Sequence, residues 1–301
     1  MNEAVVSSAP TFDLQSHSRH SDGALSPTEV VGAAADAGVR LLALSDHDTA
    51  TGVAEAQTAA REAGLALVTA TEISALFDGH QDLHVLGYLI DPQEPGLTEA
   101  LQRSRADREH RADAMADALR ELGFVLDEAM LAQRAAQGAS IGRPHLAQAV
   151  IAQAENRERC RREGLTDSTD FLVAYLVEGK PAFRPRQAPT VAEAIELIHG
   201  AGGVAIWAHP FWDISEPDAV LAAIGRFRRL GLDGIEGFYV THTEDQTRLL
   251  AAHCAEHGLL CTGSSDFHGP EHHTFSRFRA HRTYGLTPAL GPLEPERPPA
   301  G

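Results

Sequence analysis

Short apolar runs separated by alanine-rich stretches set the pattern of this chain. The runs have the length and composition of buried strands; in chain order they are VRLLAL, LALVTA, LHVLGY, GVAIWA and LLCTG. Most of the stretches between them have the composition of helices. Such β/α alternation is typical of a parallel sheet or barrel, in which right-handed crossovers bring the carboxyl ends of the strands to one face.

Helix signals fix several boundaries. Ser26 is a candidate N-cap, Pro27 and Glu29 suit a first helical turn, and Gly38 ends the stretch that follows. A second helix is expected to end at Gly64. Two later helices are predicted over residues 217–230 and 243–257. Counting a first strand that runs up to residues 13–17, the sequence predicts seven strands; the others are 39–45, 65–72, 83–88, 203–208, 233–238 and 259–264.

The alternation is interrupted between residues 99 and 182. This stretch is polar, rich in arginine and helix-forming, and it contains no strand pattern. We interpret it as an inserted helical subdomain in a discontinuous α/β domain made of residues 11–98 and 183–287. Residues 1–10 and the proline-rich segment 288–301 are expected to be disordered.

The net charge of −17 argues against a general nucleic-acid-binding surface, because nonspecific affinity for nucleic acid comes from a basic footprint. Residues 99–182 differ from the rest, since they carry 11 arginines and Lys180 against 14 acidic residues. This segment is therefore the part of the chain that suits an anionic ligand.

No apolar run approaches the roughly 20 residues that a membrane helix requires, and the first ten residues lack the features of a secretory signal. We expect a soluble, cytoplasmic protein with no membrane partner. The three cysteines include no CxxC pair, which favours reduced thiols over a disulfide framework or a cysteine-zinc site.

Ligand-type side chains gather where the predicted strands end. The stretch DLQSHSRHSDG, at 13–23, is followed by SDHD at 45–48, TEIS at 71–74, AHP at 208–210 and GSSDFHG at 263–269. A lone histidine is more often a surface or core residue than a ligand, and SDHD or DFHG alone is more often a turn with a helix cap. Five such clusters together predict a centre for divalent metal ions, which imidazole and carboxylate groups hold.

These motifs resemble those of the PHP (polymerase and histidinol phosphatase) superfamily, whose opening motif is usually DLHxHxxxSDG. The segments IGRPHLAQAVI and FLVAYLVEGKPAF resemble a branch with a helical insertion, which includes 3',5'-nucleoside bisphosphate phosphatases and 5'-3' exoribonucleases. The resemblance implies a distorted (β/α)7 barrel with an inserted helical subdomain. It also implies a trinuclear centre of divalent ions, usually manganese, iron or zinc, and we expect two to three of these ions per chain.

The resemblance further implies which residues hold these ions. One ion is expected at Gln15, His17, Glu72 and Asp266, a second at Glu72, His84 and His209, and a third at Asp22, His47 and His268. A metal-bound water held by His17, Glu72 and Asp266 would be the nucleophile. Asp46 and Asp48 are expected to orient the loop that carries His47.

Gln15 departs from the family pattern, which has histidine at this position. A neutral amide oxygen is a poorer ligand for transition metals than imidazole. We therefore expect fewer than three tightly held ions.

Arginine and lysine suit phosphate oxygens, and Arg143, His145, Lys180 and Arg184 are the candidate substrate-binding residues. Each can instead have a helix-capping or surface role. The leading hypothesis is a metal-dependent phosphoesterase that hydrolyses a phosphate monoester of a small nucleotide-like substrate, such as a 3',5'-nucleoside bisphosphate. The alternatives are a 5'-3' exoribonuclease on short RNA, a phosphatase of another phosphorylated metabolite, and a metal-poor binding module without activity.

Overall fold

The computed structural model describes residues 10–136 and 141–294. The chain divides into two compact units. The first, here called the barrel unit, comprises the chain up to Leu101 and from Pro189 onward, and the second, the helical unit, comprises Gln102–Ala188. The sequence placed its helical insertion at 99–182, so the division falls a few residues later at each boundary.

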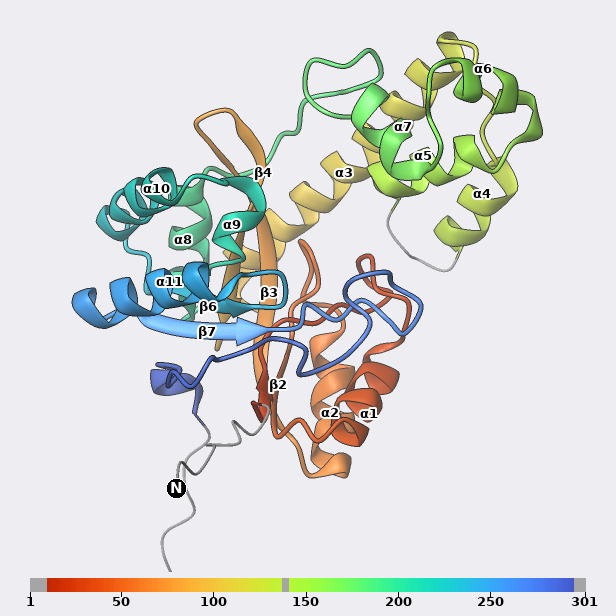
Figure 1. The fold of residues 1–301 in the computed structure, drawn as a ribbon. Helices are drawn as coiled ribbons and strands as arrows, with labels where there is room; N and C mark the ends of the chain where they lie inside the picture. The colour runs from red at the N-terminus through yellow and green to blue at the C-terminus, as the bar shows by residue number, and fades with distance from the viewer. Residues whose placement is uncertain (1–9, 137–140, 295–301) are drawn as a thin grey trace, which may run out of the picture. The chain divides into compact units, whose positions relative to one another are not determined.

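The barrel unit is built on one sheet of seven strands in chain order, the number predicted from the sequence. The strands are β1 (Phe12–Asp13), β2 (Leu41–Leu44), β3 (Ala66–Phe77), β4 (His80–Tyr88), β5 (Val204–Trp207), β6 (Gly234–Tyr239) and β7 (Leu260–Ser264). Beyond β1, the Leu14 N–H donates to the Gly263 carbonyl at 3.2 Å, and Ser16 forms a bridge with Phe267. These contacts bring the two edges together, so the predicted (β/α)7 barrel is confirmed (Figure 1).

Strand β4 departs from the predicted parallel arrangement. It runs antiparallel to both β3 and β5, because Asp78 and Gly79, with φ of 45° and 87°, join β3 to β4 in a tight hairpin. Strand β3 extends well past its pairing with β2. Glu72 and His84 therefore lie within strands, and the prediction that every cluster sits at a strand carboxyl end is wrong for these two residues. His84 still reaches the same end of the sheet as the other clusters because β4 runs in the opposite direction.

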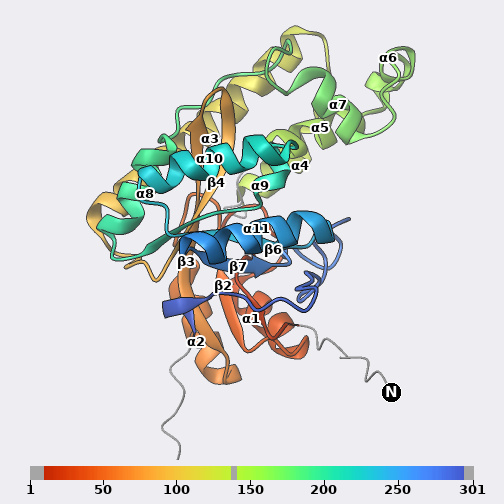
Figure 2. The same cartoon turned by 60° about the vertical axis from the view of Figure 1, so that its left-hand side comes forward.

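Helices cover the outer face of the sheet, and their ends follow the predicted signals. In α1 (Pro27–Asp36) the Ser26 hydroxyl accepts from the Glu29 N–H in a capping box, and Gly64 ends α2 (Val53–Ala63) in the left-handed conformation. Helices α8 (Val191–Gly200), α10 (Pro217–Arg229) and α11 (Glu244–His257) lie along the sheet beside β3–β7 (Figure 2). The short α9 (Pro210–Asp213) directly follows the AHP motif.

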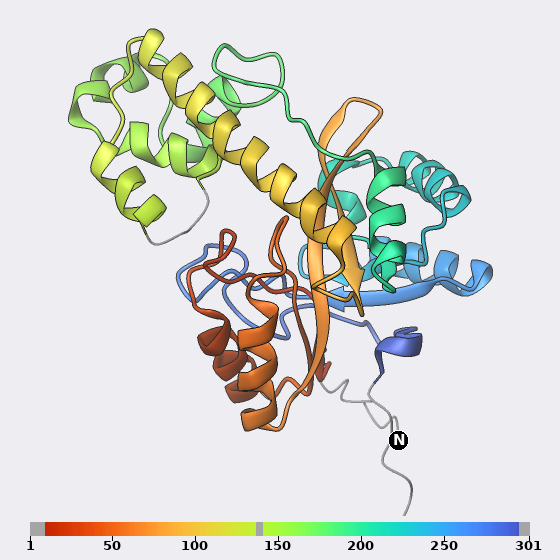
Figure 3. The same cartoon turned by 180° about the vertical axis from the view of Figure 1, so that it is seen from behind.

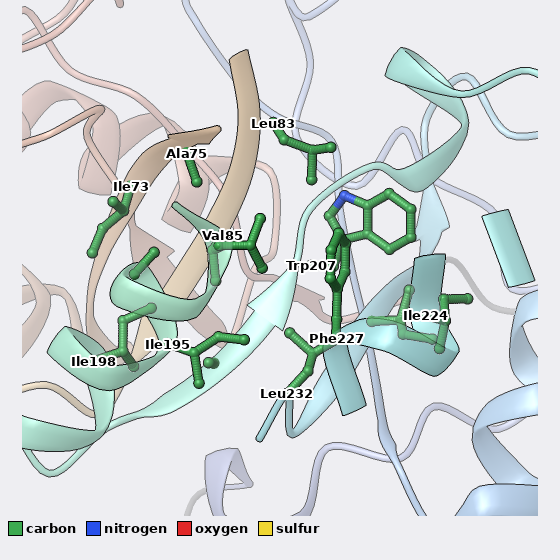
Figure 4. Packing of buried hydrophobic residues seen from close by; sticks show 14 of the residues in the cluster. Ile73, Ala75, Leu83, Val85, Ile195, Ile198, Trp207, Ile224, Phe227 and Leu232 are labelled. Atoms are coloured by element: carbon green, nitrogen blue, oxygen red, sulfur yellow. The ribbon is translucent and has the colours of Figure 1, made fainter. Parts of the chain in front are cut away.

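Alternating strand residues divide the core into two layers. Val85 and Trp207 face α8 and α10, and Trp207 meets Phe227 edge to face at 5.0 Å (Figure 4). Their strand neighbours Leu86 and Ile206 belong instead to the apolar cluster inside the barrel. This period of two is what buried strands with two covered faces require.

Residues 288–294 are ordered, contrary to the sequence prediction. Ala289 pairs with Cys261 through two backbone hydrogen bonds of 2.8 and 3.2 Å. Leu290 and Leu293 are buried in the barrel cluster, so two apolar side chains outweigh the proline-rich composition of the segment. The rest of the predicted disordered termini, 1–9 and 295–301, lies outside the described residues.

The helical unit is confirmed as helical, and its described residues contain no strand. Helix α3 (Pro95–Glu121) begins before the division point and continues into this unit (Figure 3). It is followed by α4 (Glu128–Ala136), α5 (Arg143–Ile151), η1 (Ala154–Asn156), α6 (Arg157–Arg162) and α7 (Ser168–Tyr175), which share an apolar core of their own. In neither unit do the described residues include a helix with the length and hydropathy to span a membrane.

Candidate metal centre

The opening loop after β1 is held in place by backbone and carboxylate contacts. The His17 N–H donates to the Phe267 carbonyl at 2.8 Å, which ties the loop to the segment after β7. Asp46 accepts from the Ser18 N–H, the Ser18 hydroxyl and the Ser21 hydroxyl, each at 2.7 Å. Asp48 likewise accepts from the N–H and hydroxyl of Ser74 on β3. Both carboxylates thus fix loops, which is the role predicted for them.

Glu72 is the hub of the cluster and is completely buried. Its Oε1 lies 2.9 Å from His84 Nδ1 and 3.2 Å from His209 Nε2. Its Oε2 lies 3.2 Å from His17 Nε2 and 3.6 Å from His47 Nδ1. One carboxylate thus faces four imidazoles, the geometry of a group that bridges ions.

Gln15 also contacts this hub. Its side-chain Nε2 donates to Glu72 Oε2 at 2.9 Å, and its Oε1 accepts from the Ser264 hydroxyl at 3.3 Å. In this orientation the amide presents donor hydrogens, not its oxygen, to the carboxylate. The position that departs from the family pattern therefore acts here as a hydrogen-bond donor.

His17 lies between two further imidazoles. Its ring stacks at 4.5 Å on His47 and at 4.3 Å on His268. Asp22 faces all three rings, with nitrogen to oxygen distances of 3.4 to 3.7 Å. Asp266 Oδ1 lies 3.0 Å from His17 Nε2.

The structure thus brings all nine residues of the predicted metal set into one connected cluster. Two subsets offer ligand atoms that all lie within 4.8 Å of one another: His17, Asp22, His47 and His268, and His47, Glu72 and His84. The first subset combines His17 of the first predicted site with the residues of the third, and the second combines His47 of the third site with Glu72 and His84 of the second. The division among individual ions therefore stays a prediction.

The donor atoms of the cluster fit divalent cations. Among the described side chains, two buried imidazole nitrogens of this cluster have no hydrogen-bond partner: His47 Nδ1 and His209 Nδ1. Leaving such atoms unpaired is costly unless a ligand occupies them. His268 donates from Nδ1 to the Asp266 carbonyl at 2.7 Å, and its Nε2 lies 3.4 Å from Asp22 Oδ1. These imidazole and carboxylate atoms suit manganese, iron or zinc.

The electrostatics keep the acidic ligands ionised. Burial alone would raise the pKa of Glu72, but His47 and His84 hold it well below its usual value. In the same way His47 and His268 hold the pKa of Asp22 well below its usual value against burial, and His268 and His17 lower that of Asp266 to about 2. Burial lowers the pKa of His47 to about 3, against the opposing attraction of Glu72 and Asp22.

A second layer of buried polar residues supports the cluster and was not singled out from the sequence. Glu236 accepts from the His209 N–H at 2.9 Å, and burial raises its pKa to about 8. The Tyr239 hydroxyl donates to Asp266 Oδ2 at 2.7 Å. Asp13 accepts from the Ser265 N–H and hydroxyl, and burial raises its pKa to about 7. A glutamate inside the apolar strand GIEGFY was the available signal for Glu236.

The backbone around the cluster is strained at three positions. Asp48, His209 and Asp266 have φ of 52°, 30° and 54°, a left-handed conformation that costs non-glycine residues of order 1–3 kcal/mol. Each of them follows a strand and is a predicted ligand or a neighbour of one. Such strain is typical of functional sites, where the surrounding structure holds it in place.

The four predicted substrate-binding residues all lie in the helical unit. Arg143 opens α5, where His145 Nδ1 accepts from the Gly142 N–H at 3.0 Å, so His145 has a capping role. Lys180 is exposed. The Arg184 guanidinium donates to the carbonyls of Pro181 and Phe183, in keeping with a structural role. Their contact with substrate stays a prediction.

Comparison with known proteins adds to this picture. The PHP domain family model matches residues 13–158. A 5'-3' exoribonuclease of Haemophilus influenzae is 36% identical over 259 residues, which cover 86% of this chain and 90% of that protein. A 3',5'-nucleoside bisphosphate phosphatase of Chromobacterium violaceum is 35% identical over 261 residues, which cover 86% and 87%.

A solved structure agrees with these relatives. An amidohydrolase from Chromobacterium violaceum, determined with bound sulfate, superposes with a TM-score of 0.77 at 32% identity and covers 94% of this chain and 93% of its own. The likeness therefore extends over both units and is not confined to the metal-ligand motifs. The chain belongs to the PHP domain family, as its motifs predicted.

Proposed function

We propose that this protein is a metal-dependent phosphatase that removes a phosphate from a small nucleotide-like substrate, with 3',5'-nucleoside bisphosphates as the leading class. Hydrolysis of phosphate esters is the activity class of its family, and one relative at 35% identity is named for a nucleoside bisphosphate. The observation that carries the proposal is the buried hub at Glu72, where one carboxylate faces four imidazoles.

The roles of the chain's own residues follow from this cluster. Glu72 would bridge two ions, His84 and His209 would hold one of them, and His17 and Asp266 the other. Asp22, His47 and His268 form the remaining group of donors. When bound, such ions supply an activated water and neutralise charge on the transferring phosphoryl group.

Residues that contact the predicted metal ligands hold the ligand atoms in a fixed orientation. The Tyr239 hydroxyl fixes one oxygen of Asp266 and leaves the other, Oδ1, facing His17. Glu236 holds the backbone of His209 through its N–H. Since outer contacts of this kind orient ligands, loss of either is expected to weaken metal affinity or activity by about 10- to 100-fold.

A phosphate that is not cleaved needs donors away from the metal ions. We assign this role to Arg143, His145 and Lys180, with Arg184 as a weaker candidate because its guanidinium donates to the carbonyls of Pro181 and Phe183. Guanidinium binds phosphate oxygens in a bidentate manner.

A phosphate-release screen tests the proposal. Purified protein supplied with manganese is offered adenosine 3',5'-bisphosphate, a cyclic nucleotide and a sugar phosphate. Faster release from the bisphosphate than from the others supports the proposal. Release only from the sugar phosphate would assign the protein to another phosphorylated metabolite, and no release from any substrate would favour a binding module.

The relative from Haemophilus influenzae supports a second candidate, 5'-3' exonuclease activity on short RNA. The two activities differ in how turnover depends on chain length. For the phosphatase, kcat/KM falls as the substrate grows from a mononucleoside bisphosphate to an oligoribonucleotide. For the exonuclease it rises, and mononucleotides accumulate from the 5' end.

A further inference from the structure

The two tryptophans of this chain have opposite environments. Trp207 is fully buried and packs against Phe227 in the core. Trp212 is 56% exposed and is the most exposed large apolar side chain in the described part of the protein. An indole gains much free energy from burial, so an exposed one beside a functional site suggests a surface that a ligand covers.

Trp212 lies at the rim of the candidate metal centre. Its ring is 6.4 Å from that of His209 and 5.7 Å from that of Phe275. Phe275 in turn lies 5.5 Å from His268 and 6.1 Å from Tyr239. A continuous series of rings thus leads from two predicted metal ligands to the exposed indole, all within the barrel unit.

A second exposed ring lies on the same phenylalanine. His272 stacks on Phe275 with centroids 5.0 Å apart and an interplanar angle of 26°. Its Nδ1 accepts from the Thr274 N–H at 3.2 Å and the Phe275 N–H at 3.0 Å. These two bonds fix the ring while the residue remains exposed. Two exposed rings, Trp212 and His272, therefore lie against the buried Phe275.

We propose that Trp212, His272 and Phe275 form a stacking subsite for the nucleobase of the substrate. This inference rests on the proposed nucleotide-like substrate and places its base beside the metal centre. A flat base covers exposed aromatic rings well, and stacking tolerates any base because every base has a π face. No hydrogen bond to the base is required, so the subsite selects for a base without selecting its identity.

Kinetics with and without the base test the subsite. Trp212→Ala should raise KM for adenosine 3',5'-bisphosphate about tenfold, with kcat changed by less than about twofold. Trp212→Phe keeps a stacking ring and should restore most of the affinity. Neither variant should change KM for 1-deoxyribose 3,5-bisphosphate, which lacks the base. Leu230→Ala, at another exposed apolar position of the barrel unit, should leave both KM values unchanged.

Binding provides a readout that does not depend on hydrolysis. Trp207 is buried, so fluorescence quenching by a ligand reports Trp212. Adenosine 5'-phosphate should quench the holoenzyme whereas ribose 5-phosphate should not, and Trp212→Phe should abolish the difference. If the protein hydrolyses no nucleotide, the function proposed above fails, yet this quenching would still support the subsite. Equal rises in KM for both bisphosphates, or no quenching by the adenosine compound, would overturn it.

Discussion

The candidate metal centre of the barrel unit and an ion-pair group of the helical unit place their charged side chains in opposite ways. In the barrel unit, Glu72 is completely buried among imidazoles. In the helical unit, Arg120 pairs with Asp117 and Glu128, and all three side chains are more than 40% exposed. Exposed pairs of this kind contribute about 0–1 kcal/mol, whereas a buried charge is tolerated only when it is well paired or binds a metal.

The difference indicates where function constrains the chain. Charges that add little stability and remain in water can change with small effect, because water replaces the lost partner. A buried carboxylate surrounded by imidazoles destabilises the fold unless something compensates for the desolvation. We therefore expect substitutions at matched residue types to have effects that differ sharply between the two units.

The largest effect is expected at Glu72. Glu72→Gln removes the charge that would bridge two ions, so kcat/KM should fall roughly 100- to 1,000-fold or more, while circular dichroism should show an intact fold. Glu128→Gln in the helical unit is the matched control and should leave activity unchanged. Wild-type turnover by Glu72→Gln would exclude the bridging role.

The next effect concerns the helical unit itself. If Arg143 holds the phosphate that is not cleaved, Arg143→Ala should raise KM for the bisphosphate by roughly ten- to a hundredfold, with a smaller change in kcat. Arg120→Ala removes an exposed guanidinium from the same unit and should change neither constant. An unchanged KM for Arg143→Ala on every phosphorylated substrate would remove Arg143 from the binding site.

A smaller effect is expected at position 15, where glutamine acts as a hydrogen-bond donor and histidine could act as a metal ligand. Gln15 donates to Glu72, whereas imidazole would offer a nitrogen lone pair to a metal ion. Gln15→His should therefore raise the metal retained after dialysis by about one ion per chain, as measured by elemental analysis. Gln148→His, at an exposed position of α5, is the control. Retention of three ions by the wild-type protein, unchanged in the variant, would show that glutamine suffices.

The smallest effect is a change in pH dependence. Burial raises the pKa of Glu236 from 4.5 to about 8, so between these values the folded state keeps a proton that the unfolded state has lost. The stability contribution is thus complete below pH 4.5 and is lost as pH rises through 8.

Glu236→Gln tests this sign. The neutral amide can still accept from the His209 N–H and can donate to the Ser264 hydroxyl. The melting temperature of metal-depleted protein should therefore fall less between pH 5 and about 8.5 in the variant than in the wild type. Some slope should remain, because the pKa of Asp13 is raised in the same direction, to about 7. Identical slopes would show that Glu236 does not carry the proton.

Local sequence signals predicted the fold well where a single residue determines the end of a helix. Ser26 with Glu29 and the left-handed Gly64 mark helix ends through short-range hydrogen bonds that the sequence displays directly. The motifs likewise identified ligand residues that the structure places in one cluster. What the sequence did not reveal depends on pairing between distant segments.

Two features show why. The reversal of β4 rests on a two-residue hairpin, Asp78–Gly79, inside an otherwise regular alternation. The polar network of Asp13, Glu236 and Tyr239 exists only because β1, β6 and β7 meet in the barrel. A carboxylate in an apolar strand is visible in the sequence, but its partner is not.

The split of the barrel unit around the helical unit has a consequence for the order of synthesis. Six of the predicted ligands, from Gln15 to His84, leave the ribosome before the helical unit, while His209, Asp266 and His268 follow it. The nascent chain therefore carries an open half-barrel with an incomplete set of donors until β7 is made, and the helical unit, whose core is its own, can fold in the meantime. Tight metal binding therefore follows closure of the barrel, and its timing depends on the synthesis of the last third of the chain.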